Sequence, residues 1–241
     1  MKQSQAVTRG KGKLVEQAVK KFIEMVLSRL VNAERLQVCL EANLKDLLAG
    51  KLDALTIEMF GFLLRRHLRV AEFQFDIGTS AVNLESVMRR QIQLLHPSEG
   101  SVRMVITQSQ LTAFLNAELP SLCQIQQSEF LLKQINCELR EDDAIAFHFH
   151  WTIGEENHSE TYITMPQIET NTNKVMLVIR DIEEKELPSE IVNATLARVN
   201  EIFNLTDIAD RGSTFLNQKV NIEAGKITVQ ANAYIEQLPS N

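Results

Sequence analysis

The N-terminal part of the chain carries a long apolar stripe with the period of an α-helix. Apolar residues come as adjacent pairs four positions apart: Leu14, Val15, Ala18, Val19, Phe22, Ile23, Val26, Leu27, Leu30 and Val31. On a helix of 3.6 residues per turn this spacing makes one continuous apolar face. Lys20, Lys21 and Glu24 fill the opposite face, and such charges exclude a membrane-spanning helix. The stripe therefore predicts an amphipathic helix that must be covered by another element.

Most of the chain after this helix is predicted to form β-strands, so we expect the cover to be a sheet. Apolar and polar residues alternate at 36–40, 71–77, 135–139 and 145–153, the pattern of strands with one buried face. In the last of these the apolar positions are Ile145, Phe147, Phe149, Trp151 and Ile153. Further strands are expected at 102–106, 175–179, 220–222 and 227–235, and through the alternation of Thr161, Ile163 and Met165.

Two of these segments are unusually rich in apolar residues. In the first, Leu55, Ile57, Met59 and Leu63 are expected to point one way and Phe60, Phe62 and Leu64 the other. The second, residues 175–179, is a nearly uninterrupted apolar run. A strand that is apolar on both faces is either covered on both sides or lines a cavity, and the pattern leaves both interpretations open.

Two more helices are predicted after residue 106. Thr107 and Gln110 have the spacing of a capping box, in which each side chain bonds the other residue's backbone N–H. The helix they open is expected to bury Leu111, Phe114 and Leu115 and to stop before Pro120. The second helix covers 189–204, where apolar residues recur with helical spacing after Pro188.

The charge is unevenly distributed along the chain. Residues 1–103 contain 16 Lys or Arg and 11 Asp or Glu, a net charge of +5, whereas residues 104–241 contain 9 and 20, a net charge of −11. Arg65, Arg66 and Arg69 form a predicted basic turn between two strands. This asymmetry permits an oriented approach to an anionic surface. Nucleic-acid binding is not expected, because the chain has no strongly basic domain, recognition motif or aromatic platform.

The search for catalytic and metal-binding motifs points away from an enzyme. The sequence has no nucleophile elbow, phosphate loop or dinucleotide-binding glycine motif. His148 and His150 share one face of a strand, and Glu155 or His158 would be needed to complete a metal site. Both histidines are expected on the solvated face, so we predict no metal, no cofactor and no catalytic residue.

Cysteine usage and the N-terminus indicate a reducing compartment. The chain has three widely spaced cysteines and no Cys-x-x-Cys pair, and Cys39 and Cys137 occupy strand-like apolar positions, as expected of reduced core thiols. Residues 1–10 are polar and predicted to be disordered, and no apolar signal-peptide core follows them. We expect one domain over 11–239, because no linker interrupts it, and a protein that is cytoplasmic, at most peripheral to a membrane.

Three short motifs, taken in order, resemble the bacterial LmeA-like phospholipid-binding domain family. They are the turn Leu48-Ala49-Gly50, the continuation Val82-Asn83-Leu84 of a strand, and the helix start Thr107-Gln108-Ser109-Gln110-Leu111-Thr112 with Asn116 further on. The resemblance is clear over residues 11–120 and rests only on pattern beyond them. Where the family has an acidic helix start, this chain has Gln108-Ser109-Gln110.

The resemblance implies an α+β fold, with a curved antiparallel sheet wrapped around long amphipathic helices, similar to tubular lipid-binding folds. It implies non-catalytic binding, or transfer, of phospholipid in an elongated cavity. The expected cavity wall is apolar: Phe22, Val26, Phe60, Phe62, Leu64, Phe73 and Phe75. Arg65, Arg66 and Arg69 are expected at the headgroup or membrane surface, although a solvated turn is the alternative for them. The alternative function is a protein-interaction scaffold with a filled core, and homo-oligomer formation is left open.

Overall fold

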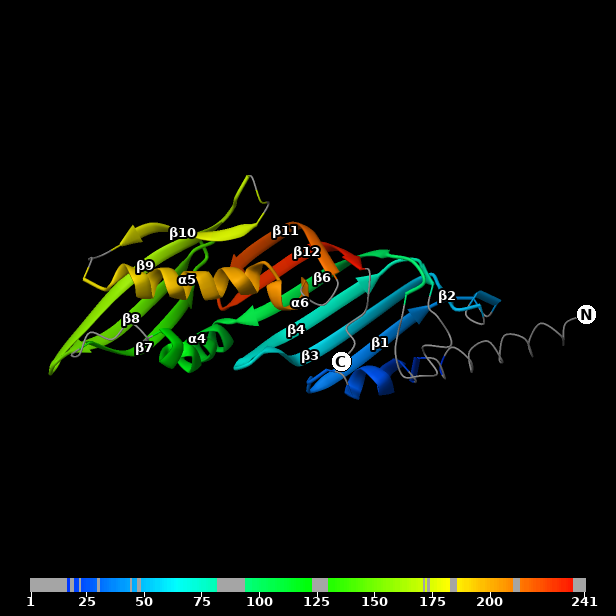
Figure 1. The fold of residues 1–241 in the computed structure, drawn as a ribbon, viewed down its shortest axis with the longest axis horizontal. Helices are drawn as coiled ribbons and strands as arrows, with labels where there is room; N and C mark the ends of the chain where they lie inside the picture. Colours follow the sequence, from blue (N-terminus) through cyan, green and yellow to red (C-terminus); the bar gives the residue numbers. More distant parts are fainter. Residues whose placement is uncertain are drawn as a thin grey trace, which may run out of the picture.

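The computed structural model describes residues 17, 20–21, 23–29, 31–43, 45–46, 49–81, 94–122, 130–170, 172, 174–182, 186–209 and 213–235. These residues form an elongated α+β structure built on antiparallel strands (Figure 1). The predicted tail at residues 1–10 and the predicted wall residue Phe22 lie outside the described part.

Two sheets lie end to end along the molecule (Figure 1). The larger has six strands in the order β1 (Arg35–Glu41), β3 (Ala54–Arg65), β4 (Leu68–Ile77), β6 (Ser98–Thr107), β12 (Lys226–Ile235) and β11 (Ser213–Glu223). The other has four strands in the order β10 (Val175–Ile182), β9 (Glu156–Ile168), β8 (Ile145–Ile153) and β7 (Phe130–Leu139). A short pair joins β2 (Lys51–Leu52) to β5 (Ser80–Ala81). The predicted antiparallel α+β class is confirmed.

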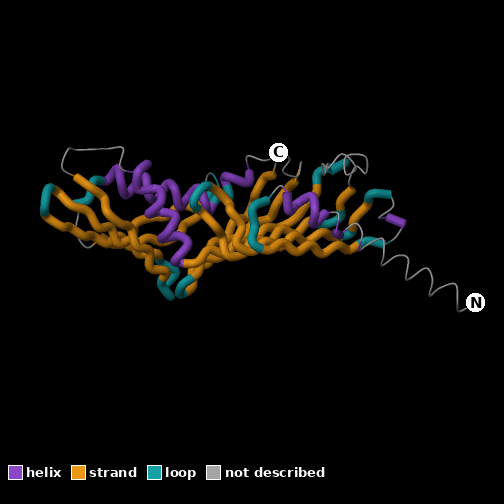
Figure 2. The backbone as a smooth tube through the Cα atoms, turned by 90° about the horizontal axis from the view of Figure 1, so that it is seen from below, coloured by secondary structure: helices purple, strands orange, loops and turns teal. Residues whose placement is uncertain are grey.

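The helices lie along one side of the strand layer (Figure 2). They are the helical residues 23–29, α4 (Gln108–Leu122), α5 (Ser189–Phe203) and the short α6 (Thr206–Ala209). Helix α4 packs on β7 of the small sheet and on β4 and β6 of the large one, so it bridges the two sheets. A sheet wrapped around these helices as a tube stays a prediction.

The described part of the N-terminal helix is amphipathic as predicted. Ile23 and Val26 are buried, while Lys21 is exposed on the other face. Lys20 and Glu24 are 3.9 Å apart and form an ion pair across one helical turn. The stripe therefore directs this segment onto the apolar core, to which Ile23 belongs.

The capping box at the start of α4 is confirmed, but the predicted end of the helix is wrong. The N–H of Thr107 donates to Gln110 Oε1 at 3.0 Å, and the N–H of Gln110 donates to Thr107 Oγ1 at 3.3 Å. The helix continues through Pro120 to Leu122. In the last turn Pro120 removes only one intrahelical hydrogen bond, and burial of Leu122 favours the continuation.

Strand β3 does not alternate regularly as the sequence analysis assumed. Its buried residues are Leu55, Ile57, Met59, Phe62 and Leu64, so the alternation shifts by one position at Gly61, whose φ is 59°. The neighbouring strand shifts at the same level, burying Leu68, Val70, Phe73, Phe75 and Ile77. The prediction that Phe60 shares the environment of Phe62 and Leu64 is therefore wrong: Phe60 is half-buried, whereas the other two are buried.

Three predictions on the small sheet are also wrong. Ile153 is 45% exposed, because it lies at the end of β8 beside the turn. In β9 the buried side is Glu160, Tyr162 and Thr164, because Tyr162 lies opposite Phe147 of β8 and Thr164 lies opposite Ile145. In the apolar run of β10, Met176 and Val178 are exposed, since β10 is an edge strand with one covered face.

Cys137 is buried as predicted, whereas Cys39 is exposed, because it points away from the core on edge strand β1. Burial raises the pKa of the Cys137 thiol from 9.0 to about 12. Cys137 is thus a core residue without thiolate reactivity at neutral pH.

Both edges of the small sheet are satisfied by side chains from the helices. On β7, the N–H of Ile135 donates to Asn116 Oδ1 at 3.1 Å, and Asn116 Nδ2 donates to the Ile135 carbonyl at 2.7 Å. On β10, Asn204 makes the same two bonds with Val175, at 2.9 and 2.7 Å. Gln108 and Thr112 of α4 and Asn200 of α5 accept further N–H groups of these edges.

Candidate functional site

The predicted wall residues converge on the hairpin formed by β3 and β4. The rings of Phe62 and Phe73 are 5.4 Å apart between centroids and tilted by 54°. Phe75 lies opposite Ile57 in the strand pairing, and Leu64 completes the buried set at the hairpin end. The structure therefore brings Phe62, Leu64, Phe73 and Phe75 into one apolar core.

The remaining predicted wall residues occupy different surroundings. The guanidinium of Arg35 lies over the Phe60 ring, 3.9 Å from its centroid, so this half-buried ring takes part in a cation–π contact. Val26 is buried on the N-terminal helix, at 4% exposure. Among the predicted wall residues that the structure describes, Phe60 is thus the one that is not buried.

The apolar surface extends further than the sequence analysis predicted. Across the sheet, Phe73 lies opposite Met104 of β6, which in turn lies opposite Val229 of β12. Two residues further along each strand, the next row consists of Phe75, Val102 and Ala231. Period-two alternation in β6 and β12 was visible in the sequence, but which strands are neighbours was not.

In Figure 1 strands β3, β4 and β6 lie between two groups of helices. Helices α4 and α6 are near the junction of the two sheets, α5 runs along the small sheet towards it, and the helical residues 23–29 are beside β1. The side chains themselves are closely covered, since Phe62 and Phe75 are 8% exposed and Phe73 is 4% exposed. The candidate site is therefore an apolar sheet surface inside the protein.

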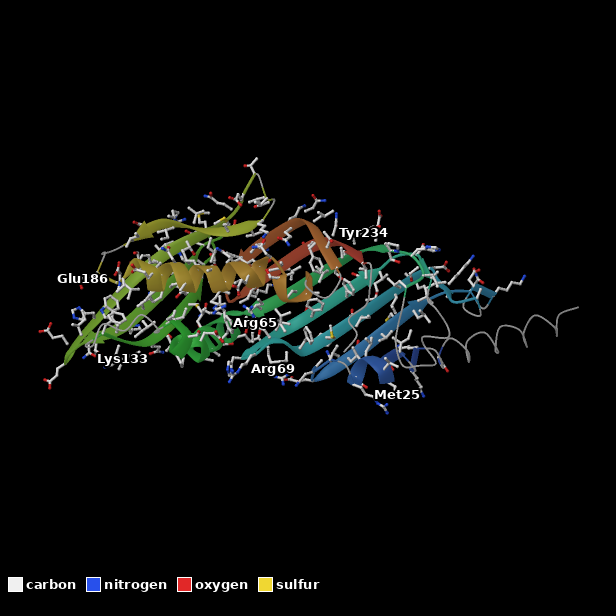
Figure 3. All side chains as sticks on the ribbon, viewed as in Figure 1. Met25, Arg65, Arg69, Lys133, Glu186 and Tyr234 are labelled. Carbon is white, nitrogen blue, oxygen red and sulfur yellow. The ribbon has the colours of Figure 1, made fainter. Side chains whose placement is uncertain are left out.

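The basic turn is held in place by internal partners. Both terminal nitrogens of Arg65 lie 3.0 Å from Glu201 Oε2, which joins the β3–β4 hairpin to α5. Arg69 donates to the Gly61 carbonyl at 2.6 Å and to Asn32 Oδ1 at 2.9 Å. Figure 3 shows Arg65 beside the helices at the sheet junction and Arg69 on the outer side of the hairpin.

Arg66 differs from these two arginines. It lies in the turn itself, next to His67, whose φ is 68°, and its side chain is exposed. Because Arg65 and Arg69 are engaged with Glu201, Gly61 and Asn32, Arg66 is the member of the turn most available to an external anion.

A buried polar cluster at the far end of the small sheet was missed by the sequence analysis. Glu160 is 4% exposed, and its Oε2 accepts the N–H groups of Glu186 and Leu187, at 3.1 and 2.8 Å, just before α5. His158 stacks on Trp151 with 5.7 Å between ring centroids, and its Nδ1 is 3.3 Å from a Glu186 carboxylate oxygen. The alternation at 156–164 is compatible with a strand face that buries Glu160. The charge of the Glu160 side chain, however, argued against assigning that face to the core.

The neighbouring charge also affects Tyr162. Desolvation raises the pKa of its hydroxyl, and the hydrogen bond to Glu160 raises it further. Glu160 thus anchors the chain that enters α5 through two backbone N–H groups. These bonds give Glu160 a structural role.

His148, one of the histidines considered as metal ligands, makes ordinary side-chain contacts. His148 Nδ1 is 2.9 Å from Thr161 Oγ1, and its Nε2 is 3.4 Å from Glu138 Oε2. Among the residues that the structure describes, no three His, Cys, Asp or Glu side chains are grouped so as to hold a metal ion. In the same part of the chain, no helix is long and apolar enough to cross a membrane.

The described residues thus define an α+β protein with an extended internal apolar surface and a braced basic turn. The chain matches the family model described as LmeA-like phospholipid-binding over residues 6–232, nearly its whole length, and it belongs to that family. The predicted family resemblance is confirmed. No curated protein and no solved structure matches the chain.

Proposed function

We propose that the protein binds phospholipid without catalysing a reaction, with the acyl chains lying along the apolar surface of β3, β4, β6 and β12. The observation that carries this proposal is the continuity of that surface across four paired strands in a chain of a phospholipid-binding family. Apolar rows such as Phe75, Val102 and Ala231 suit a chain of methylene groups, each of which gains about 0.8 kcal/mol on burial.

The lipid headgroup would lie at the basic hairpin end. Arg66 is exposed there, while Arg65 and Arg69 stiffen the turn through Glu201, Gly61 and Asn32. A braced turn presents a guanidinium to phosphate at lower entropic cost than a mobile one. An elongated cavity enclosed by the curved sheet and the helices is part of this proposal, as is transfer of lipid between membranes.

A second candidate function is an interaction scaffold with a filled core. It is favoured by the close covering of the same side chains, of which Met104 is fully buried. The two candidates differ in what occupies the space over β12, where Ala231 and Ala233 are the small residues of the buried side. A larger side chain at this place therefore distinguishes them.

The test is native mass spectrometry of the purified protein and of Ala231→Phe. Lipid binding predicts phospholipid adducts on the wild type that are reduced several-fold in Ala231→Phe, with a small change in stability, because the new ring replaces an acyl segment. The matched control is Asn232→Phe, the exposed neighbour on the other face of β12, which should retain the adducts.

A bare wild-type mass would contradict lipid binding. It would support the filled core if Ala231→Phe also lost about 1–3 kcal/mol of unfolding free energy, the usual effect of overpacking. Urea denaturation of the two variants measures that loss.

A further inference from the structure

Strand β1 differs from the edges of the small sheet and from β11 in its regularity, and among the described strands it is paired on one side only. It forms the edge of the six-stranded sheet, and in the described part of the chain its ladder partner is β3 alone, over seven consecutive pairs without a register shift. The edges of the small sheet are instead occupied by Asn116 and Asn204 and their neighbours. The helical residues 23–29 lie beside β1 in Figure 1, but the helices lie on one side of the strand layer and not in its plane (Figure 2).

The opposite edge of the large sheet, β11, is protected in the usual ways. Its register shifts between Leu216 and Lys219, and Asn217 between them has a φ of 52°. Helix α6 packs on the strand, and Gln218 donates to the Asn204 carbonyl. Bulges and lysines of this kind prevent edge-to-edge pairing. Strand β1, by contrast, has no bulge and contains neither Pro nor Lys.

The sequence of β1, Arg35-Leu-Gln-Val-Cys-Leu-Glu41, is complementary to itself when two copies run antiparallel. With Val38 opposite the same residue of the second copy, Arg35 lies opposite Glu41 at both ends of the pairing. Leu36 then lies opposite Leu40, and Gln37 opposite Cys39. A two-fold axis passes through the Val38 pair and repeats each of the other contacts twice, as an isologous interface requires.

The charged ends of β1 are available for this pairing. Arg35 and Glu41 are both exposed, and neither forms an ion pair with another described residue. The guanidinium carbon of Arg35 lies 3.9 Å from the centroid of the Phe60 ring, and a guanidinium in a cation–π contact keeps its N–H donors for hydrogen bonds to other groups. Opposite charges directly across an antiparallel pair favour one register over its alternatives.

We propose that β1 is a homodimerisation edge, at which a second copy of this chain adds its own β1 antiparallel about Val38. The two large sheets then form one continuous sheet of twice the width. The proposal is independent of lipid binding, because the apolar surface of β3 and β4 is not part of the edge.

A charge swap tests the pairing. Analytical ultracentrifugation should find the wild type dimeric, with self-association at least tenfold weaker in Arg35→Glu and in Glu41→Arg. The double variant, Arg35→Glu with Glu41→Arg, should recover the wild-type affinity to within about threefold, because the pair is restored with reversed polarity. A monomeric wild type, single variants that dimerise normally, or a double variant as weak as the singles would each overturn the proposal.

Cys39 gives a second readout that does not depend on charge. With a rise of about 3.3 Å per residue and strands about 5 Å apart, the two Cys39 residues of the dimer lie roughly 8–9 Å apart. In a Cys123→Ser background, a bismaleimide of similar reach should cross-link the two chains through Cys39, since Cys137 is buried. Cys39→Ser should abolish the product and Arg35→Glu should reduce it tenfold; a product that persists in Arg35→Glu would contradict this register.

Discussion

At the scale of single residues, the core contains groups whose ionisation is suppressed by burial. The pKa of the Cys137 thiol is raised from 9.0 to about 12, chiefly because the thiolate would be desolvated in the core. The unfolded chain therefore loses this proton at a lower pH than the folded protein does. A group of this kind contributes stability that is complete below the unfolded pKa and is lost as the pH rises towards the folded one.

The free energy of unfolding should accordingly fall between pH 9 and 10, by up to about 1.4 kcal/mol per pH unit from this one thiol. The Cys137→Ala variant should start from a lower stability but show a flatter dependence on pH in this interval. Urea denaturation at half-unit steps measures both slopes. Parallel slopes in the two proteins would show that the thiol is not protected by folding.

At the scale of elements, helices α4 and α5 perform the same task on opposite edges of the small sheet. Asn116 of α4 bonds both backbone groups of Ile135, and Asn204, the C-cap residue of α5, bonds both backbone groups of Val175. Gln108, Thr112 and Asn116 are spaced four apart and therefore share one face of α4. The helix-start motif behind the family resemblance thus has a structural role, which is to close the edge of β7.

Removing either asparagine should leave a backbone N–H and a carbonyl without their partner. We expect Asn116→Ala and Asn204→Ala each to lose about 1–3 kcal/mol of unfolding free energy. Both variants should also aggregate faster on partial unfolding, because an open edge is a template for pairing. Asn232→Ala, an exposed asparagine of β12, serves as the control and should change stability by less than about 0.5 kcal/mol.

At the scale of the whole molecule, helices and an ion pair join the two sheets in the described part of the chain. Helix α4 packs on both sheets, and Arg65 reaches from the large-sheet hairpin to Glu201 on α5. This contact spans 136 residues of sequence. One domain over residues 11–239 stays a prediction. These connections also hold the turn that carries the exposed Arg66 in a fixed position. This turn belongs to the basic N-terminal part of the chain, whereas the C-terminal part is acidic.

This arrangement predicts stronger binding to anionic than to zwitterionic liposomes. Arg66→Ser should weaken the anionic preference by up to ~1 kcal/mol, the usual effect of one basic residue near such a surface. Lys174→Ser, an exposed change in the acidic half, should leave it unaltered. Sedimentation at 0.1 M and 1 M salt should show the preference disappearing, because the screening length falls from about 10 Å to about 3 Å. A preference that survives 1 M salt would exclude a surface-charge origin.

The sequence by itself determined the features that depend on local periodicity. The amphipathic stripe around Ile23 and Val26, the capping box of Thr107 and Gln110, and the alternation that buries Phe147 and Phe149 follow from residue spacing, and the structure confirms them. The family resemblance also came from short motifs in order along the chain.

Only the tertiary structure decided which residues share a site. The shift at Gly61 separates Phe60 from Phe62, and it depends on a left-handed backbone conformation that residue spacing does not encode. The rows that link Phe75 to Ala231 depend on strand order, which joins segments more than 150 positions apart. Arg65 was predicted to be solvated or at a headgroup, yet Glu201 binds it, because the fold brings α5 to the hairpin. Contacts between distant segments are set by packing, and local patterns carry no information about them.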